Sequence, residues 1–298
     1  MDKEYLQFFL KEFSYPEEDC KAILAAYETF VERKEAFDTV VSYIKEYEQD
    51  IQCNFMMILY NMRELSESIG VHEYTGQLLI LLCLSKQLRE YYLQKGYPLS
   101  VWKTCMQDIY YKVVECKMIY GVCGVSVNYW FKGFFQCTRF AFEKLQFELV
   151  EMPFAYQNDE IDVKEKEPVI KVHIPRTGGH LERSGQLLAY QRADEYFRKH
   201  FGLKKVIFIL DSWFLFPEMK NFVSPQSNLG MFIADYTIMD WGYFEDFSKI
   251  SWRIYDTPET DLEKLPQNTS LQKKYLQHIK NGGKSGWGYG IFVYPPKV

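Results

Sequence analysis

The strongest constraint on this chain is a change in the spacing of its apolar residues near residue 132. Before that point, apolar side chains recur every three or four residues, the spacing that gives a helix one buried face. After Gly133 they form short extended runs bounded by Gly, Pro and Asp, which is typical of strands. With 298 residues, the chain is long enough for two cores. We therefore expect two domains, residues 1–132 and 133–298.

The first region is predicted to be an all-α bundle of six or seven helices. Its longest helical segment, 74–93, is closed by Gly96 and Pro98, and the next helix is expected over 99–119. The region has no paired carboxylates or histidines at the spacing of metal ligands. We therefore assign it no chemistry of its own.

Charge and hydropathy exclude two classes of partner. The formal charge is -5, and the acidic excess lies in residues 1–132, with 14 Lys and Arg against 19 Asp and Glu. Nucleic-acid binding usually needs a basic face, so we expect no DNA or RNA partner. The longest apolar run, 78–84, is far shorter than the roughly 20 residues that span a bilayer. The first residues lack the apolar block of a secretory signal, so we expect a cytoplasmic protein without a membrane segment.

Seven cysteines all lie in the first 137 residues, and none forms a Cys-x-x-Cys pair. Zinc sites and thioredoxin-like redox pairs depend on such spacings. Most of these cysteines have apolar neighbours, where a free thiol behaves as a small hydrophobic group. No metal site is expected.

The second region reads as an α/β pattern. Its expected helices are 184–201, a short one from residue 216, and 269–281. The expected strands are 140–149, 169–174, 206–210, 231–239, 251–255 and 289–293.

A glycine-rich turn joins the strand that ends near His173 to the helix that follows Ser184. Its residues are Ile174, Pro175, Arg176, Thr177, Gly178, Gly179, His180 and Leu181. Such a turn lets backbone N–H groups approach an anion, and the helix N-terminus adds a favourable dipole. The spacing matches neither the P-loop nor the dinucleotide-binding motif. The structural alternative is an ordinary tight turn.

Several stretches together resemble one family. They are Val172-His173-Ile174-Pro175, the Gly-Gly turn, Asp211 to Pro217, Ser227-Asn228, Trp252-Arg253 and Leu265-Pro266. These stretches are similar in sequence to those of two-domain acyltransferase-like proteins, in which a helical N-terminal domain precedes a domain of the GNAT (general N-acetyltransferase) fold. The resemblance implies an α+β protein whose C-terminal domain has a mixed central sheet. It also implies acetyl-CoA or a longer acyl-CoA as the donor, and an amine on a small molecule or peptide as the acceptor.

The resemblance places the donor on the glycine turn, and the positions of nearby residues at strand ends suggest the other roles. The coenzyme A pyrophosphate would contact Ile174 and the backbone of 176–181, that is Arg176, Thr177, Gly178, Gly179, His180 and Leu181. His173 would remove the proton from the acceptor amine, with Asp211 as the second candidate base and Ser212 as the nearest hydroxyl to protonate the thiolate. Trp213 and Asn228 would contact the acceptor. Each also has a structural alternative: a strand-end histidine, a turn or cap residue, and a core tryptophan.

Two departures from the GNAT pattern keep a second function open. Leu181 stands where the family motif has a small residue, and residues 211–222 contain no Tyr to protonate the leaving thiolate. The alternative is a GNAT-like binding module that has lost catalysis and recognises a small ligand or a protein. A serine hydrolase is disfavoured, because no Gly-x-Ser-x-Gly elbow occurs.

Overall fold

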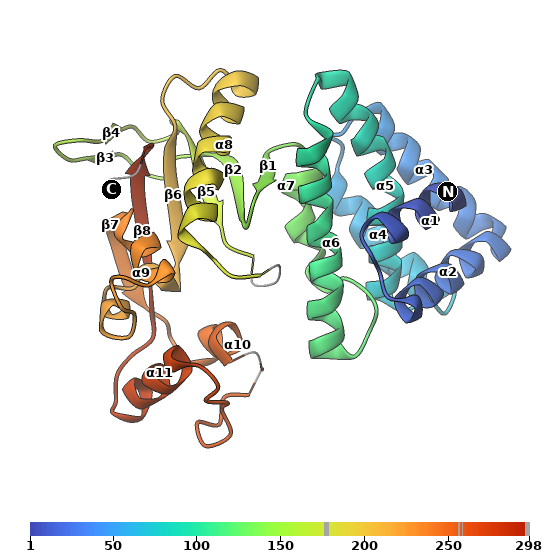
Figure 1. Cartoon of the computed structure of the whole chain (residues 1–298). Coiled ribbons are helices and arrows are strands. Elements are labelled where there is room, and N and C mark those ends of the chain that lie inside the picture. The colour runs from blue at the N-terminus through green and yellow to red at the C-terminus, as the bar shows by residue number, and fades with distance from the viewer. Residues whose placement is uncertain (176–178, 256, 258, 296–298) are drawn as a thin grey trace. The chain divides into compact units, whose positions relative to one another are not determined.

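The computed structural model describes residues 1–175, 179–255, 257 and 259–295 (Figure 1). The chain forms two compact units, Met1–Phe140 and Ala141–Val298. The first is helical and the second contains a mixed sheet, which confirms the predicted fold class.

The first unit is a bundle of consecutive helices. They are α1 (Lys3–Glu12), α2 (Glu17–Glu32), α3 (Lys34–Gln49), α4 (Phe55–Ser68), α5 (Glu73–Lys95) and α6 (Leu99–Tyr120), followed by the 3-10 helix η1 (Asn128–Phe131) and α7 (Lys132–Phe135). Their ends follow local chemistry. The Asp2 side chain accepts a hydrogen bond from the Tyr5 backbone N–H at 2.9 Å, and Gly96 and Gly121 end α5 and α6 in the left-handed conformation.

Helix α5 lies at the centre of the bundle, and α1, α2, α3, α4 and α6 all pack against it. The continuous run Leu78–Leu84 is buried, because neighbouring helices cover this part of α5 on all sides. Among the described helices, none combines the length and apolar character needed to cross a bilayer. The apolar run therefore belongs to the core of the helical unit.

The second unit begins within the first strand, β1, and then alternates strands and helices. Its elements are β1 (Arg139–Phe142), β2 (Leu145–Glu151), β3 (Tyr156–Gln157), β4 (Asp162–Val163), β5 (Pro168–His173), α8 (Arg183–Phe201), β6 (Ile207–Ser212), η2 (Trp213–Leu215), η3 (Pro217–Asn221), α9 (Asn228–Ala234), β7 (Thr237–Tyr243), α10 (Ser248–Tyr255), α11 (Ser270–Lys280) and β8 (Gly286–Val293).

The six-stranded sheet has the order β1-β2-β5-β6-β8-β7. Strands β5 and β6 are parallel, whereas β2 with β5, β6 with β8 and β7 with β8 are antiparallel. Helix α8 covers one face of the sheet, where the Tyr190 ring lies 5.9, 5.2 and 4.9 Å from the rings of Phe147, Phe208 and Phe292. Residues of the β3–β4 hairpin, including Ile161 and Val163, cover part of the opposite face.

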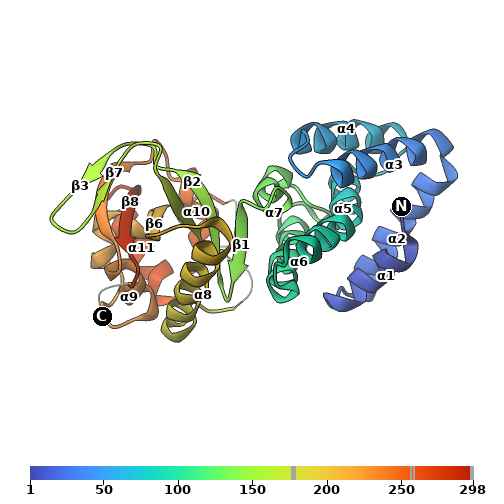
Figure 2. The same ribbon diagram turned by 90° about the horizontal axis from the view of Figure 1, so that it is seen from above.

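Figure 2 turns the same ribbon to give a view from above. Helices α10 and α11 lie beyond one end of the sheet, away from the β3–β4 hairpin (Figure 1). They share a separate apolar cluster, in which Ile254, Tyr255, Tyr275 and Leu276 are buried.

Val169 of β5 packs in the same cluster as the hairpin residues Ile161 and Val163. Alternate residues of a strand point to the same side, so Lys171 and His173 lie on the sheet face that the hairpin partly covers.

The prediction of one strand over 140–149 is wrong. The segment forms two strands, β1 and β2, with a turn at Glu143 and Lys144 between them. Glu143 has φ of +50°, a left-handed conformation that reverses the chain. Most turns contain Gly, Asn or Pro, and the pair Glu143–Lys144 contains none of them, so the local sequence does not indicate a turn.

The segments 231–239 and 251–255 also differ from the expected strands. Helix α9 occupies residues up to Ala234, and strand β7 starts only at Thr237. The segment 251–255 is the end of helix α10, which buries Ile250, Ser251, Ile254 and Tyr255. This spacing is that of a helix, and a window of five residues was too short to show it.

We expect Gly288→Ala to destabilise the sheet unit. A Cβ at Gly288 would lie 2.1 Å from the Leu215 carbonyl oxygen, so backbone has to move, at a cost of about 1–3 kcal/mol. Gly185→Ala in α8 is the matched control, because its Cβ meets no atom within 4 Å and Ala favours a helix by up to about 1 kcal/mol. Urea unfolding of both variants measures the difference, and equal stability of the two would contradict it.

Candidate functional site

The parallel strands β5 and β6 pair over a short stretch only. Ile170 is opposite Phe208 and Lys171 is opposite Ile209, and the described residues contain no further pair between these strands. Both strands nevertheless continue, β5 to His173 and β6 to Ser212. Their carboxyl ends therefore run side by side without a shared ladder. In open α/β sheets, ligands bind at this end of the strands.

A row of polar side chains crosses one sheet face at this end. His173 stands two residues beyond Lys171 and Asp211 two beyond Ile209, so both occupy the same level and the same face. Tyr289 on β8 is the register partner of Asp211. Burial, and secondarily the Asp211 charge, raises the pKa of Tyr289 to about 12. The phenol is therefore protonated at neutral pH.

His173 forms a close pair with Glu148 on the neighbouring strand β2. Its Nε2 lies 2.8 Å from Glu148 Oε2, and the two side chains are 14% and 18% exposed. In the antiparallel register, Gln146 is opposite His173 and Glu148 is opposite Lys171, so the contact is a diagonal one on a single face. Glu148 and Tyr289 are missing from the sequence-based candidates. The only signal was the polar residues at alternate positions of a strand that is otherwise apolar.

The glycine turn leads from this row to α8. The predicted contacts Arg176, Thr177 and Gly178 lie outside the described residues. Gly179 and His180 are exposed, and Gly179 has φ of +96°, which favours glycine. Within the stretch 179–185, the backbone N–H of Arg183 alone has an acceptor among the residues that the structure describes.

The N-terminus of α8 is accordingly open to an anion. No side chain caps this helix at Glu182, and the backbone N–H groups of Ser184 and Gly185 in its first turn have no acceptor in the described structure. Unpaired N–H groups and the helix dipole together favour negative charge. Ile174 and Leu181 flank the turn and are both half-buried.

Asn228 holds the start of α8 in place. Its Oδ1 accepts a hydrogen bond from the Arg183 backbone N–H at 3.1 Å, and its carbonyl oxygen accepts one from Gln186 Nε2 at 3.0 Å. The Arg183 guanidinium donates two hydrogen bonds to Asp235, at 2.6 and 2.8 Å. Burial raises the pKa of Asp235, and the contact with Arg183 opposes that shift. This network connects α8 with α9.

Ser212 and Trp213 follow Asp211 at the end of β6. The Ser212 hydroxyl accepts a hydrogen bond from the Phe214 backbone N–H at 3.2 Å and so caps η2. Alternation along β6 places Ser212 on the face opposite to Asp211. Trp213 packs against the cluster formed by η3, α10 and α11.

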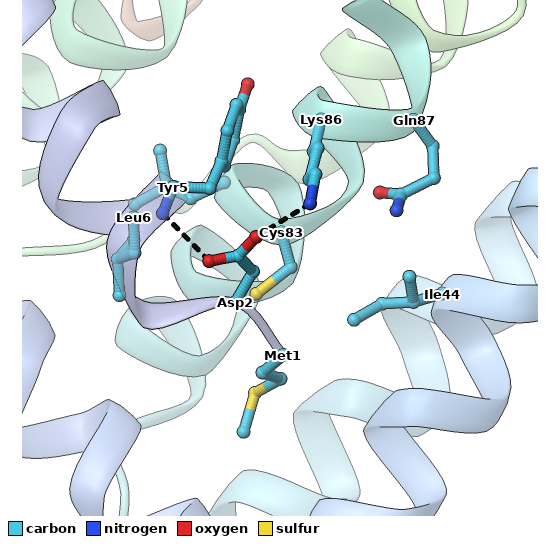
Figure 3. A pocket seen from close by; sticks show the side chains of 9 residues that line it. Met1, Asp2, Tyr5, Leu6, Ile44, Cys83, Lys86 and Gln87 are labelled. Carbon is cyan, nitrogen blue, oxygen red and sulfur yellow. Dashed lines mark hydrogen bonds and ion pairs between the residues drawn. The ribbon is translucent and has the colours of Figure 1, made fainter. Parts of the chain in front are cut away.

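The helical unit contains a separate pocket of about 200 Å³ (Figure 3). Its lining residues are Met1, Asp2, Tyr5, Leu6, Ile44, Leu82, Cys83, Lys86 and Gln87. The Asp2 carboxylate lies between the Tyr5 backbone N–H and the Lys86 ammonium, which is 2.6 Å away (Figure 3). Burial raises the pKa of the Cys83 thiol to about 12, so the thiol is protonated and is not an activated nucleophile.

In the part of the chain that the structure describes, no group of three His, Cys, Asp or Glu side chains is placed to hold a metal ion. Of the two candidate sites, the end of β5 and β6 combines backbone N–H groups that lack a described acceptor with a histidine and its carboxylate partner. The pocket in the helical unit has no comparable reactive pair.

Two family models together account for most of the chain. Residues 4–137 match the N-acyltransferase N-terminal domain, and residues 140–292 match the GNAT-like C-terminal domain. The chain belongs to this two-domain acyltransferase family. The resemblance that the sequence motifs indicated is thereby confirmed. Among proteins with curated functions, none matches this chain in sequence.

Solved acyltransferase structures share the fold over nearly the whole chain. One, an acyltransferase in complex with decanoyl-CoA and teicoplanin, has a TM-score of 0.75 and 20% identity, and the match covers 97% of this chain and 87% of that one. Another, a mutant acyltransferase in complex with octanoyl-CoA, has a TM-score of 0.77 and 20% identity, covering 98% and 88%. At these identities the likeness shows an acyltransferase fold.

We expect Arg183→Ala to destabilise the protein more than Asp235→Ala. Removing Arg183 leaves a carboxylate that is 1% exposed without its cation, which costs about 3 kcal/mol. Removing Asp235 costs less, because the Arg183 side chain is 20% exposed and can reach water. Urea unfolding at neutral pH measures both losses. Equal losses would show that the pair acts through packing and not through charge.

Proposed function

We propose that the protein is an acyl-CoA-dependent N-acyltransferase that moves an acyl group from coenzyme A to an amine by direct attack. The observation that carries this proposal is the place where β5 and β6 stop pairing. In the turn before α8, backbone N–H groups without an acceptor among the described residues lie beside it, and His173 stands at its edge. A thioester with a charged diphosphate tail matches this combination of anion site and base.

The donor would bind by its pyrophosphate to the turn. The N–H groups of residues 179–182, 184 and 185 have no acceptor among the described residues, and the dipole of α8 supplements them. The sequence alone suggests the remaining residues of the proposed contact, which are Arg176, Thr177 and Gly178. The acyl chain would be longer than acetyl, because the similar acyltransferases are complexes with octanoyl-CoA and decanoyl-CoA.

The proposed reaction needs no oxidant and no metal. His173 takes a proton from the acceptor amine, and the amine nitrogen forms a bond with the thioester carbonyl carbon. The carbon–sulfur bond then breaks, and the thiolate receives a proton. The candidate hydroxyl donors are Ser212, at the end of β6 on the opposite face, and Tyr289, which is the register partner of Asp211. Asp211 is the second candidate base, since it is exposed at the same level as His173.

The acceptor would be an amine on a small molecule or a peptide-like compound. One similar acyltransferase is a complex with teicoplanin, and another a complex with 10C-Teicoplanin. The alternative function, a GNAT-like binding module without catalysis, is favoured by one observation. The bulky Leu181 side chain is half-buried in the turn, where close approach of a diphosphate needs space.

We expect decanoyl-CoA to bind the protein and to raise its melting temperature. Gly179→Val should weaken this binding at least tenfold, because a β-branched residue resists a φ of +96° and the turn must rearrange. Gly202→Val is the control, since Gly202 has φ of +69° at the far end of α8 and introduces similar strain. Calorimetric titration measures both. If the wild-type protein does not bind decanoyl-CoA, the acyltransferase proposal is ruled out and the binding-module alternative remains.

We expect His173→Ala to lower turnover about 100-fold or more while the affinity for decanoyl-CoA stays within about twofold. Free thiol release in the presence of glucosamine, lysine or a short peptide measures turnover, and calorimetry measures affinity. His200→Ala at the end of α8 is the control, and it should leave both unchanged. If His173→Ala reduces folding stability but not turnover, the histidine has a structural role.

A further inference from the structure

In the hydrogen bond between His173 and Glu148, the donor and the acceptor can be assigned. Glu148 Oε2 is 2.8 Å from His173 Nε2, and an ionised carboxylate is an acceptor only. The neutral imidazole must therefore carry its proton on Nε2 to make this hydrogen bond. The lone pair is then on Nδ1, on the other side of the ring.

The position of Glu148 in the sheet makes this contact well determined. Glu148 lies inside β2, and six successive residue pairs set the register of β2 with β5. Both side chains are largely buried, so water competes weakly for the carboxylate. A carboxylate held at this distance also favours the charged imidazolium over the neutral ring.

We propose that Glu148 is a positioning residue for His173: it selects the Nε2–H tautomer, directs Nδ1 as the proton acceptor, and stabilises the imidazolium that forms when the amine is deprotonated. The proposal rests on the proposed function only for its last part. The tautomer itself is a property of the folded protein without any ligand.

Among the described residues, three charged groups lie on the face of His173: Glu148 on β2, Lys171 on β5 itself and Asp211 on β6. The neutral phenol of Tyr289 lies one strand further, on β8. Lys171 opposes the imidazolium and Asp211 favours it. Glu148 is distinguished from Asp211 by its direct hydrogen bond with the ring.

Nitrogen NMR of the full-length protein with labelled histidine tests the tautomer. The chain has five histidines, so the signals can be assigned with a His173→Gln sample. We expect neutral His173 to show a protonated Nε2 and an unprotonated Nδ1. In Glu148→Ala the two nitrogens should move toward averaged shifts as both tautomers become populated. A wild-type His173 that carries its proton on Nδ1 would overturn the proposal, as would a tautomer that Glu148→Ala leaves unchanged.

The isosteric variant Glu148→Gln tests the charge. It retains an oxygen acceptor for Nε2–H but removes the negative charge, so the imidazolium loses stability. The NMR titration midpoint of His173 should therefore move to lower pH. Glu151→Gln, an exposed position on the same strand, is the matched control and should leave the midpoint unchanged. An unchanged midpoint in Glu148→Gln would contradict the assigned role. Unchanged signals from the other four histidines show that a variant is folded.

Turnover with decanoyl-CoA and an amine adds a second readout. In Glu148→Gln we expect kcat to fall roughly 10-fold to 100-fold, with the KM for decanoyl-CoA unchanged and the acidic limb of the pH profile moved to lower pH. Wild-type protein that releases no thiol would refute the proposed function, whereas the tautomer measurement would still decide the role of Glu148. Wild-type turnover that Glu148→Gln leaves unaltered would refute the positioning role alone.

Discussion

The short parallel contact between β5 and β6 is the constraint on which the rest of the second unit depends. Two residue pairs join these strands, while longer antiparallel ladders support each of them from the outer side, β2 for β5 and β8 for β6. The outer ladders make the sheet stable without a complete central ladder. The ends of β5 and β6 therefore need no ladder between them, and this is where a ligand would reach both the backbone and the polar sheet face.

The surroundings of this position are rigid on one face and polar on the other. Tyr190 of α8 packs against aromatic rings from three strands, so the helix that follows the glycine turn is anchored to the sheet. Asn228 and the Arg183–Asp235 pair hold its first turn. These contacts satisfy the N–H of Arg183 and leave its neighbours without a protein acceptor in the described structure. An anion would therefore meet N–H groups that are already oriented, which reduces the entropic cost of binding it.

Much of the fold could be predicted from local patterns. The helical unit follows from apolar residues at three- and four-residue steps, and Gly96 ends its helix as expected. The errors occurred where local patterns were ambiguous. Glu143 forms a turn without a typical turn residue, and residues 251–255 form the last part of a helix whose first residues looked polar. Strand and helix differ too little over five residues for spacing to decide.

The sequence by itself determined the two kinds of domain, the glycine turn between a strand and a helix, and His173 at the end of that strand, because each depends on neighbours along the chain. Only the tertiary structure brought Glu148 to His173 and Tyr289 to Asp211. Glu148 and His173 are 25 residues apart in the sequence, and their contact depends on the register of β2 against β5. A shift of one residue would turn Glu148 to the opposite face. The register is set by the whole apolar core of the sheet, and no short stretch of sequence encodes it.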